Sequence, residues 1–265
     1  MSVPRQPFFS AGPSYRPKRI APNGEARRGG DIDWPRWLRL VERKRRLTTR
    51  PDQRRPRSLP DSMLQLGTLA SFRLEGIELD DATAIAALRP GALKPGVLKS
   101  GRDHNHFRSR LAMRIRNHVA ILHRIERGLH HGESLKTAAV VRWYTLISSG
   151  LSITSLDEPT MARLDQLVRR INSPHLRLQP AVQEIARLHA QSIADPLVPG
   201  FNGILARLLL RYHLGRCGLP PVVFHAESDA PLLTDETTLL ARLLELIDES
   251  YDLLLSEMPP QAAGV

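Results

Sequence analysis

Apolar residues recur at helical spacing through most of the chain after residue 61, and this pattern predicts its elements. The longest stretch predicts a helix over about 104–129, with leucine and isoleucine three or four residues apart and a stop at Gly132. The same signals predict further helices over about 62–75, 80–88, 134–147, 159–171, 180–194 and 235–257. No run alternates convincingly at a period of two residues, so the predicted fold class is all-α.

The helix that begins at Asn202 is expected to be the buried centre of the domain. Asn202 is its predicted N-cap, and Gly218 with the prolines after it marks the end. A helix that is apolar on nearly all sides is usually buried. Little polar face is left here by Ile204, Leu205, Leu208, Leu209, Leu210 and Leu214. The last helix is predicted to start at Thr234.

Positive charge is concentrated before residue 61. Residues 1–60 hold 16 Lys and Arg against 5 Asp and Glu, a net charge of +11 that equals the net charge of the whole chain. We therefore predict two parts, a disordered basic arm rich in proline and arginine over 1–60 and a neutral helical domain over 61–265. Charge alone would attract such an arm to nucleic acid or an anionic surface, and the alternative is a solvated tail without a fixed partner.

One short amphipathic helix is predicted inside the arm. Asp33 can cap it, and one face carries Trp34, Trp37, Leu38 and Val41. Arginine and lysine cover the remaining surface, so the helix could lie on a membrane or on nucleic acid. Docking of the tryptophan face on the protein's own domain is the favoured interpretation.

Cysteine usage and hydropathy suggest a compartment. Cys217 is the single cysteine, which excludes a disulfide within the chain and favours reducing surroundings. The N-terminus has no apolar signal region, and no transmembrane segment is expected from the apolar runs. A cytoplasmic protein is the resulting expectation.

Histidines are the first candidates for chemistry, since the chain has ten of them. Six lie between His104 and His131, but no third ligand accompanies His123 and His130 on one helix face, so no metal site is expected. His189 shares a helix face with apolar residues and is expected to be a core histidine.

Two segments carry a more specific signal. The first, residues 71–77, reads SFRLEGI, and the second runs from His189 to Val223 and includes ADPLVPGFNGILAR. Together with Arg-Asn-His-Val at 116–119, these segments resemble the Fic (Fido) family, whose domains are compact helical bundles. The resemblance spans about residues 62–225. It implies a helix that carries a regulatory glutamate, and a later loop between two helices that holds a nucleotide such as ATP.

The resemblance assigns expected roles to individual residues. Asn202, Gly203 and Arg207 match the family's nucleotide- and phosphate-binding positions. Ser71, Glu75 and Gly76 match its regulatory motif, and Glu75 is implied to form a salt bridge with Arg207. In physical terms, glycines at a helix N-terminus expose N–H groups that favour anions.

The catalytic positions of the family loop are not matched. Pro196 stands where the family has a histidine base. A shift of one residue puts Asp195 in that place, which makes Asp195 the only catalytic candidate in the loop. Gly200 or Pro199 replaces the acidic residue that holds the metal, so Mg²⁺ is not expected to be well bound. Ile204 replaces the first arginine.

Three functions remain open from the sequence. The favoured one is a degenerate Fic-type pseudoenzyme without adenylyltransferase activity, acting as a binding or regulatory module toward an unknown protein partner. The second is an active nucleotidyl- or phospho-group transferase of the AMPylation type with a rearranged loop. The third is a nucleic-acid-associated protein that acts through the basic arm.

Overall fold

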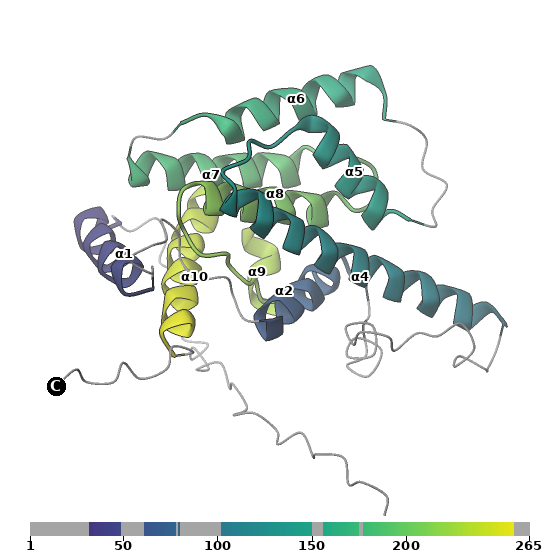
Figure 1. Ribbon diagram of the computed structural model, residues 1–265, viewed down its shortest axis with the longest axis horizontal. Helices are drawn as coiled ribbons and strands as arrows, with labels where there is room; N and C mark the ends of the chain where they lie inside the picture. Colours follow the sequence, from purple (N-terminus) through teal and green to yellow (C-terminus); the bar gives the residue numbers. More distant parts are fainter. Residues whose placement is uncertain are drawn as a thin grey trace, which may run out of the picture. The chain divides into compact units, whose positions relative to one another are not determined.

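The structure is a computed structural model, and it describes residues 32–48, 61–77, 79, 102–149, 156–174 and 177–256. Within these ranges it contains helices and no strand, so the predicted all-α class is confirmed (Figure 1). In chain order the elements are α1 (Trp34–Thr48), α2 (Asp61–Arg73), α4 (Arg102–His130), α5 (Thr137–Ile147), α6 (Glu158–Asn172), α7 (Leu178–Ala194), α8 (Asn202–Arg216), α9 (Ala226–Asp229), the 3₁₀ helix η1 (Ala230–Leu232) and α10 (Glu236–Ser256). The helix expected at 80–88, and residues 1–31 and 49–60 of the expected arm, lie outside the described residues.

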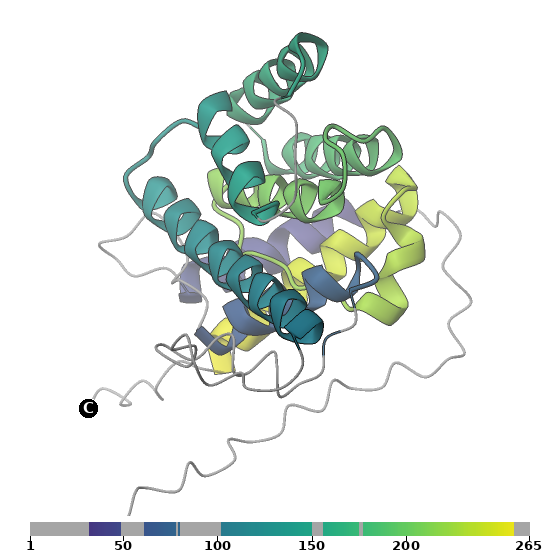
Figure 2. The same ribbon diagram turned by 90° about the vertical axis from the view of Figure 1, so that its right-hand side faces the viewer.

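Helix α8 is the centre of the domain, as its sequence predicts. Residues 202–214 are buried with the exception of Arg207, which is slightly exposed overall. Helices α2, α4, α5, α6 and α7 all contact α8, and α7 lies alongside it (Figure 2). Because α8 has no solvent face, every polar side chain on it must find a partner inside the domain.

Two helix starts differ from the expected positions for local polar reasons. Helix α5 begins at Thr137 instead of about 134, because the backbone of Leu135 forms two hydrogen bonds with the Asn172 side chain. Helix α10 is capped by Asp235 and not by Thr234, since Asp235 Oδ1 accepts a hydrogen bond of 2.8 Å from the Thr238 amide. The predicted cap of α1 is confirmed, because the Arg36 amide donates to Asp33 Oδ1 over 3.0 Å.

Helix α1 packs against α10, and the expected docking of its tryptophan face is confirmed. Trp37 Nε1 donates to the Leu244 carbonyl, and Val41 is fully buried. Lys44 Nζ lies 2.5 Å from Asp248 and 2.6 Å from Asp252. One compact unit spans residues 32–265, so α1 packs as part of the helical domain although its sequence lies within the predicted arm.

No helix in the described part of the chain combines the length and the apolar character that crossing a membrane requires.

Candidate functional site

Arg207 on α8 is held by two residues near the end of α2. Its Nε donates to Ser71 Oγ over 2.7 Å, and its Nη2 donates to the Ser71 carbonyl over 2.7 Å and to Glu75 Oε1 over 2.8 Å. The Arg207 side chain is 8% exposed and that of Glu75 is 19% exposed. The expected salt bridge is therefore present, and the charge of Arg207 is compensated inside the domain.

Gly76 ends α2 in a way that fixes the position of Glu75. The Ile77 amide donates to the Phe72 carbonyl and the Gly76 amide donates to the Arg73 carbonyl, which is the pattern of a Schellman motif. This motif needs a left-handed residue, and Gly76 has a φ of 71°. Gly76 is thus a stop signal that leaves Glu75 as the last residue before the chain turns.

Gly203 lets Glu75 approach the start of α8. A β-carbon built on Gly203 would lie 2.0 Å from Glu75 Oε1 and 3.0 Å from Arg207 Nη1. Carbon atoms essentially never come this close to a neighbouring oxygen, so the ion pair occupies space that any larger residue would claim. Gly203 therefore permits the ion pair through its lack of a side chain.

A cavity of about 280 Å³ adjoins this ion pair at the N-terminal end of α8. Its wall includes Glu75, Gly200, Asn202, Gly203 and Arg207. The other sides are formed by apolar residues from the turn after α2, from α7, and from η1 and the residue after it. The first turn of an α-helix carries unpaired amide groups and a partial positive charge. The cavity thus brings together a helix N-terminus, a guanidinium and the carboxylate that neutralises it.

Asn202 holds the loop that precedes α8, and its predicted role as N-cap was wrong. The cap position is occupied by Phe201. The Asn202 Oδ1 accepts hydrogen bonds from the amides of Leu197 (2.8 Å) and Val198 (3.4 Å), and its Nδ2 donates to the Ser192 carbonyl over 2.7 Å. All three bonds point back to residues before the helix, so the side chain of Asn202 is already committed to loop structure.

Asp195, the catalytic candidate, lies outside the residues that line this cavity. It caps the C-terminus of α7, its side chain is 78% exposed, and its Oδ2 lies 2.6 Å from Arg163 Nη2 of α6. Arg163 also donates to the Asp195 carbonyl over 3.1 Å. Asp195 is therefore held at the surface by Arg163 and is not placed to reach a hydroxyl bound in the cavity.

A second buried ion pair lies one helical turn further along α8. Arg211 Nη2 is 2.6 Å from Glu126 Oε1 of α4, with exposures of 10% and 26% for the two side chains. Burial lowers the pKa of both Arg207 and Arg211, while the partner carboxylates oppose that shift. The sequence reasoning missed this pair, although an arginine four residues after Arg207 on a buried helix signals it, because a buried guanidinium needs a carboxylate.

His118 on α4 is buried close to both arginines. Its Nδ1 lies 3.0 Å from Thr68 Oγ1, whose hydroxyl donates to the Leu64 carbonyl, so the ring donates to the threonine. Burial, together with the positive charges of Arg207 and Arg211, lowers the pKa of His118 to about 3. His118 is thus a neutral side chain, and it adds no third positive charge beside the two guanidinium groups.

His189 on α7 is a core residue, as predicted. It is 3% exposed and stacks on Phe224 with a centroid distance of 5.9 Å, and neither ring nitrogen has a hydrogen-bond partner in the part of the chain that the structure describes. Burial, followed by the charge of Arg207, lowers its pKa to about 3. Its interior position keeps it from acting as a base on a substrate.

The loop between α7 and α8 is braced by side chains that the sequence did not single out. Tyr144 of α5 donates to the Pro199 carbonyl over 2.9 Å. The guanidinium carbon of Arg114 lies 4.9 Å from the centroid of the Phe201 ring, and Arg114 also donates to the Ser149 carbonyl. These contacts explain why Phe201 is buried at a position where the family resemblance implies a bare glycine.

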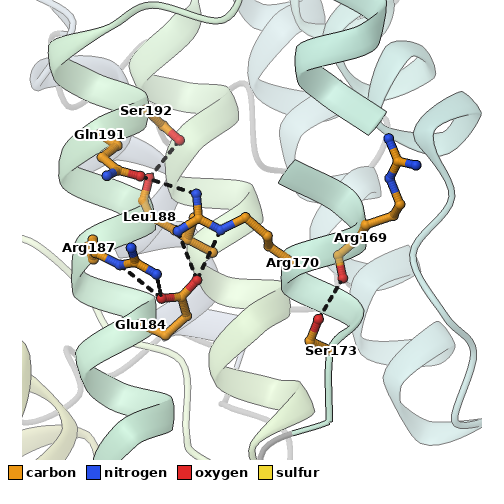
Figure 3. A network of polar contacts seen from close by, with 8 residues as sticks. All are labelled: Arg169, Arg170, Ser173, Glu184, Arg187, Leu188, Gln191 and Ser192. Carbon is orange, nitrogen blue, oxygen red and sulfur yellow. Dashed lines mark hydrogen bonds and ion pairs between the residues drawn. The ribbon is translucent and has the colours of Figure 1, made fainter. Parts of the chain in front are cut away.

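Helix α7 is itself anchored to α6 by a polar network (Figure 3). Figure 3 shows the Glu184 carboxylate between Arg170 and Arg187, and Arg170 also donates to Gln191. Burial raises the pKa of Glu184, but Arg187 and Arg170 outweigh this effect and lower it. The network fixes the C-terminal half of α7, from which the Ser192 carbonyl reaches Asn202.

In the described part of the chain, no group of three histidine, cysteine, aspartate or glutamate side chains could hold a metal ion.

No protein-family model matches this sequence, and no curated protein matches it either.

Proposed function

We propose that the protein is a degenerate Fic-type binding or regulatory module without adenylyltransferase activity. Its ligand is a phosphate-bearing molecule such as a nucleotide, and its site is the cavity at the N-terminal end of α8. In the absence of ligand, the Glu75 carboxylate occupies the position beside Arg207 that the ligand's phosphate would take. Ligand binding requires Glu75 to move away from Arg207. An unidentified protein partner would be the means of separating them.

One observation carries this proposal: among the described residues, the one carboxylate bonded to Arg207 belongs to Glu75, which also lines the cavity. A guanidinium binds a phosphate and a carboxylate through the same donor geometry, so an anion entering the cavity would compete with Glu75. Gly203 leaves room for either group at the helix N-terminus. The order of these residues along the chain is the one that the Fic resemblance implies.

The binding role is favoured over transfer chemistry by the state of the remaining loop residues. Asp195 is paired with Arg163 at the surface, and both buried histidines near Arg207 are neutral. Nucleotidyl transfer needs a base within hydrogen-bond reach of the attacking hydroxyl and a cation at the phosphates. Among the described residues that line the cavity there is no imidazole, and the one carboxylate is that of Glu75, which is engaged by Arg207.

The test is the affinity for ATP and for pyrophosphate, measured by calorimetry for the wild-type chain and for Glu75→Gln. The glutamine keeps the shape of the side chain but removes the competing charge, so the affinity is expected to rise by roughly tenfold or more, about 1.4 kcal/mol. The double variant Glu75→Gln/Arg207→Met should lose the gain, because the guanidinium is then absent.

Glu126→Gln is the matched control. This variant removes the carboxylate that pairs with Arg211, a second buried arginine on α8. Glu126 does not line the cavity at the N-terminal end of α8. No change in affinity is expected for this control. Equal affinity of the wild-type chain, Glu75→Gln and the double variant would overturn the proposal, and so would the absence of binding to Glu75→Gln.

A further inference from the structure

Helix α1 has an outward face that its docking leaves free. Trp37, Val41 and Lys44 face α10 or the core, as their contacts show. The residues on the opposite side are exposed, and they are Arg36, Arg39, Leu40, Arg43, Arg46 and Leu47. The four arginines are spaced three, four and three residues apart, which keeps them on one side of a helix.

This face carries nearly uncompensated positive charge. Among the described residues, no carboxylate pairs with the guanidinium groups of Arg36, Arg39 or Arg43. Glu42 is the one acidic residue of the helix, and it pairs with Arg46 and lies 3.9 Å from Arg45. Such exposed pairs contribute little energy, so Arg46 remains open to exchange its partner for a stronger anion.

We infer that this arginine face of α1 is a binding surface for the phosphate backbone of a nucleic-acid duplex. The four arginines span residues 36–46, a rise of about 15 Å along the helix axis, and over this length one strand of a duplex presents roughly four phosphates. Arginine binds phosphate through two parallel donors, which suits it to this role better than lysine. Contacts to backbone phosphates carry no sequence information, so this face would bind a duplex without regard to its base sequence.

A membrane surface is the less suitable partner. An amphipathic helix binds a bilayer by burying its apolar face among the headgroups, but that face of α1 is already covered by α10. Leu40 and Leu47 are the exposed apolar residues that remain on the helix, at 38% and 48% exposure. Because only these two partly exposed leucines could insert, binding to anionic lipid would depend mostly on the arginine charges.

A single strand is also less suitable than a duplex. Non-specific binding of single strands relies on aromatic rings that stack on the bases. The aromatic residues of α1, Trp34 and Trp37, contact each other edge to face and pack against the core. The rings are therefore not presented beside the arginines.

The experiment measures binding of a short fluorescent DNA duplex to the full chain by anisotropy over a range of salt concentrations. The triple variant Arg36→Gln/Arg39→Gln/Arg43→Gln should raise Kd by roughly tenfold or more and reduce the slope of log K against log salt by about 2 to 3. The corresponding lysine variant retains the charges and should keep most of the slope. Circular dichroism and the melting temperature should stay unchanged in both variants, because the three side chains are exposed.

The charge-matched control is Arg54→Gln/Arg55→Gln/Arg57→Gln, which removes three positive charges from the segment after α1. If net charge alone attracts the duplex, both glutamine variants will weaken binding equally, and this result would overturn the inference. A wild-type chain that binds vesicles of anionic lipid in an α1-dependent manner but does not bind the duplex would also overturn it.

Discussion

Glu75 and Gly203 share one small volume at the start of α8, although they come from helices far apart in the sequence. The Glu75 carboxylate lies where the first side-chain atom of any other residue at position 203 would be, at 2.0 Å from that point. The same carboxylate accepts a hydrogen bond of 2.8 Å from Arg207. The close packing of α2 on α8 and the neutralisation of the Arg207 charge thus both depend on the absence of a side chain at Gly203.

Replacement of Gly203 by alanine tests this dependence. The added methyl group would displace the Glu75 carboxylate and leave the buried Arg207 without its counter-charge. Breaking a buried ion pair costs on the order of 3–5 kcal/mol, and we expect a loss of unfolding free energy near that size, measured by urea denaturation. Gly67→Ala is the control, since its new β-carbon would lie at an ordinary 3.4 Å from Val223 and alanine favours the helix.

Asn202→Ala is expected to loosen the loop before α8. The substitution leaves the Leu197 amide and the Ser192 carbonyl without partners, and an unsatisfied buried polar group costs about 1–3 kcal/mol. Amide hydrogen exchange at residues 195–201 should become faster, with a loss of unfolding free energy of about 2–4 kcal/mol. Asn117→Ala removes a single amide bond to the Leu146 carbonyl, so its effect should be smaller. Unchanged exchange in the loop would contradict the role of Asn202 as its anchor.

The helical fold was predictable from the sequence because apolar spacing and glycine stops are local signals. The buried helix over 202–216 is the best case, since its apolar residues surround the whole helix and need no knowledge of its neighbours. The starts of α5 and α10 were less predictable, because Asn172 and Asp235 decide them through specific hydrogen bonds. The short α9 and η1 carry no periodic signal at their length.

Side-chain partners in the site were harder to predict than the elements. The salt bridge of Glu75 with Arg207 was expected from motif order, whereas Glu126 and Arg211 belong to no motif and required knowledge of how α4 crosses α8. The prediction of Asn202 as an N-cap was wrong because an asparagine side chain can accept hydrogen bonds equally well from the first turn of a helix or from the loop before it. The direction of its bonds depends on the path of residues 192–198, which no local pattern reveals.

Deletion of α1 should destabilise the domain. The domain predicted from charge over 61–265 begins after α1, so a chain with these bounds lacks the Trp37 and Lys44 contacts with α10. Burial of a large apolar side chain contributes about 2–3 kcal/mol, so Trp37→Ala should lower the unfolding free energy by roughly that amount.

The chain 32–265 retains α1, and we expect it to melt cooperatively and at a higher temperature than the chain 61–265. Equal melting temperatures would show that α1 docking contributes nothing measurable.

Acid should destabilise the protein through its buried histidines. His118 and His189 have folded-state pKa values of about 3 against 6.5 for an ordinary histidine, so the unfolded chain binds protons that the folded chain does not. Above about pH 6.5 both rings are neutral in the folded and the unfolded chain and do not affect stability. As the pH falls from there toward 3, each ring lowers the free energy of unfolding by up to about 1.4 kcal/mol per pH unit. His189→Phe keeps the stacking on Phe224 and should remove about half of this slope between pH 6 and 5, as measured by urea denaturation. The exposed His123→Phe should leave the slope unchanged.

Incubation of the Glu75→Gly variant with labelled ATP distinguishes the proposed binding module from an active transferase. Loss of a general base typically slows proton transfer by roughly 100- to 10,000-fold, and the loop from 195 to 207 contains no imidazole. Glu75→Gly should free Arg207 to hold a phosphate, yet Asp195 stays paired with Arg163 on the surface and supplies no base beside the cavity. We therefore expect no covalent label on the chain after incubation of Glu75→Gly with radiolabelled ATP and Mg²⁺, even where calorimetry shows that this variant binds ATP. Strong labelling that disappears in Glu75→Gly/Asp195→Ala would establish transferase chemistry at this loop and would refute the non-catalytic function while leaving the phosphate site intact.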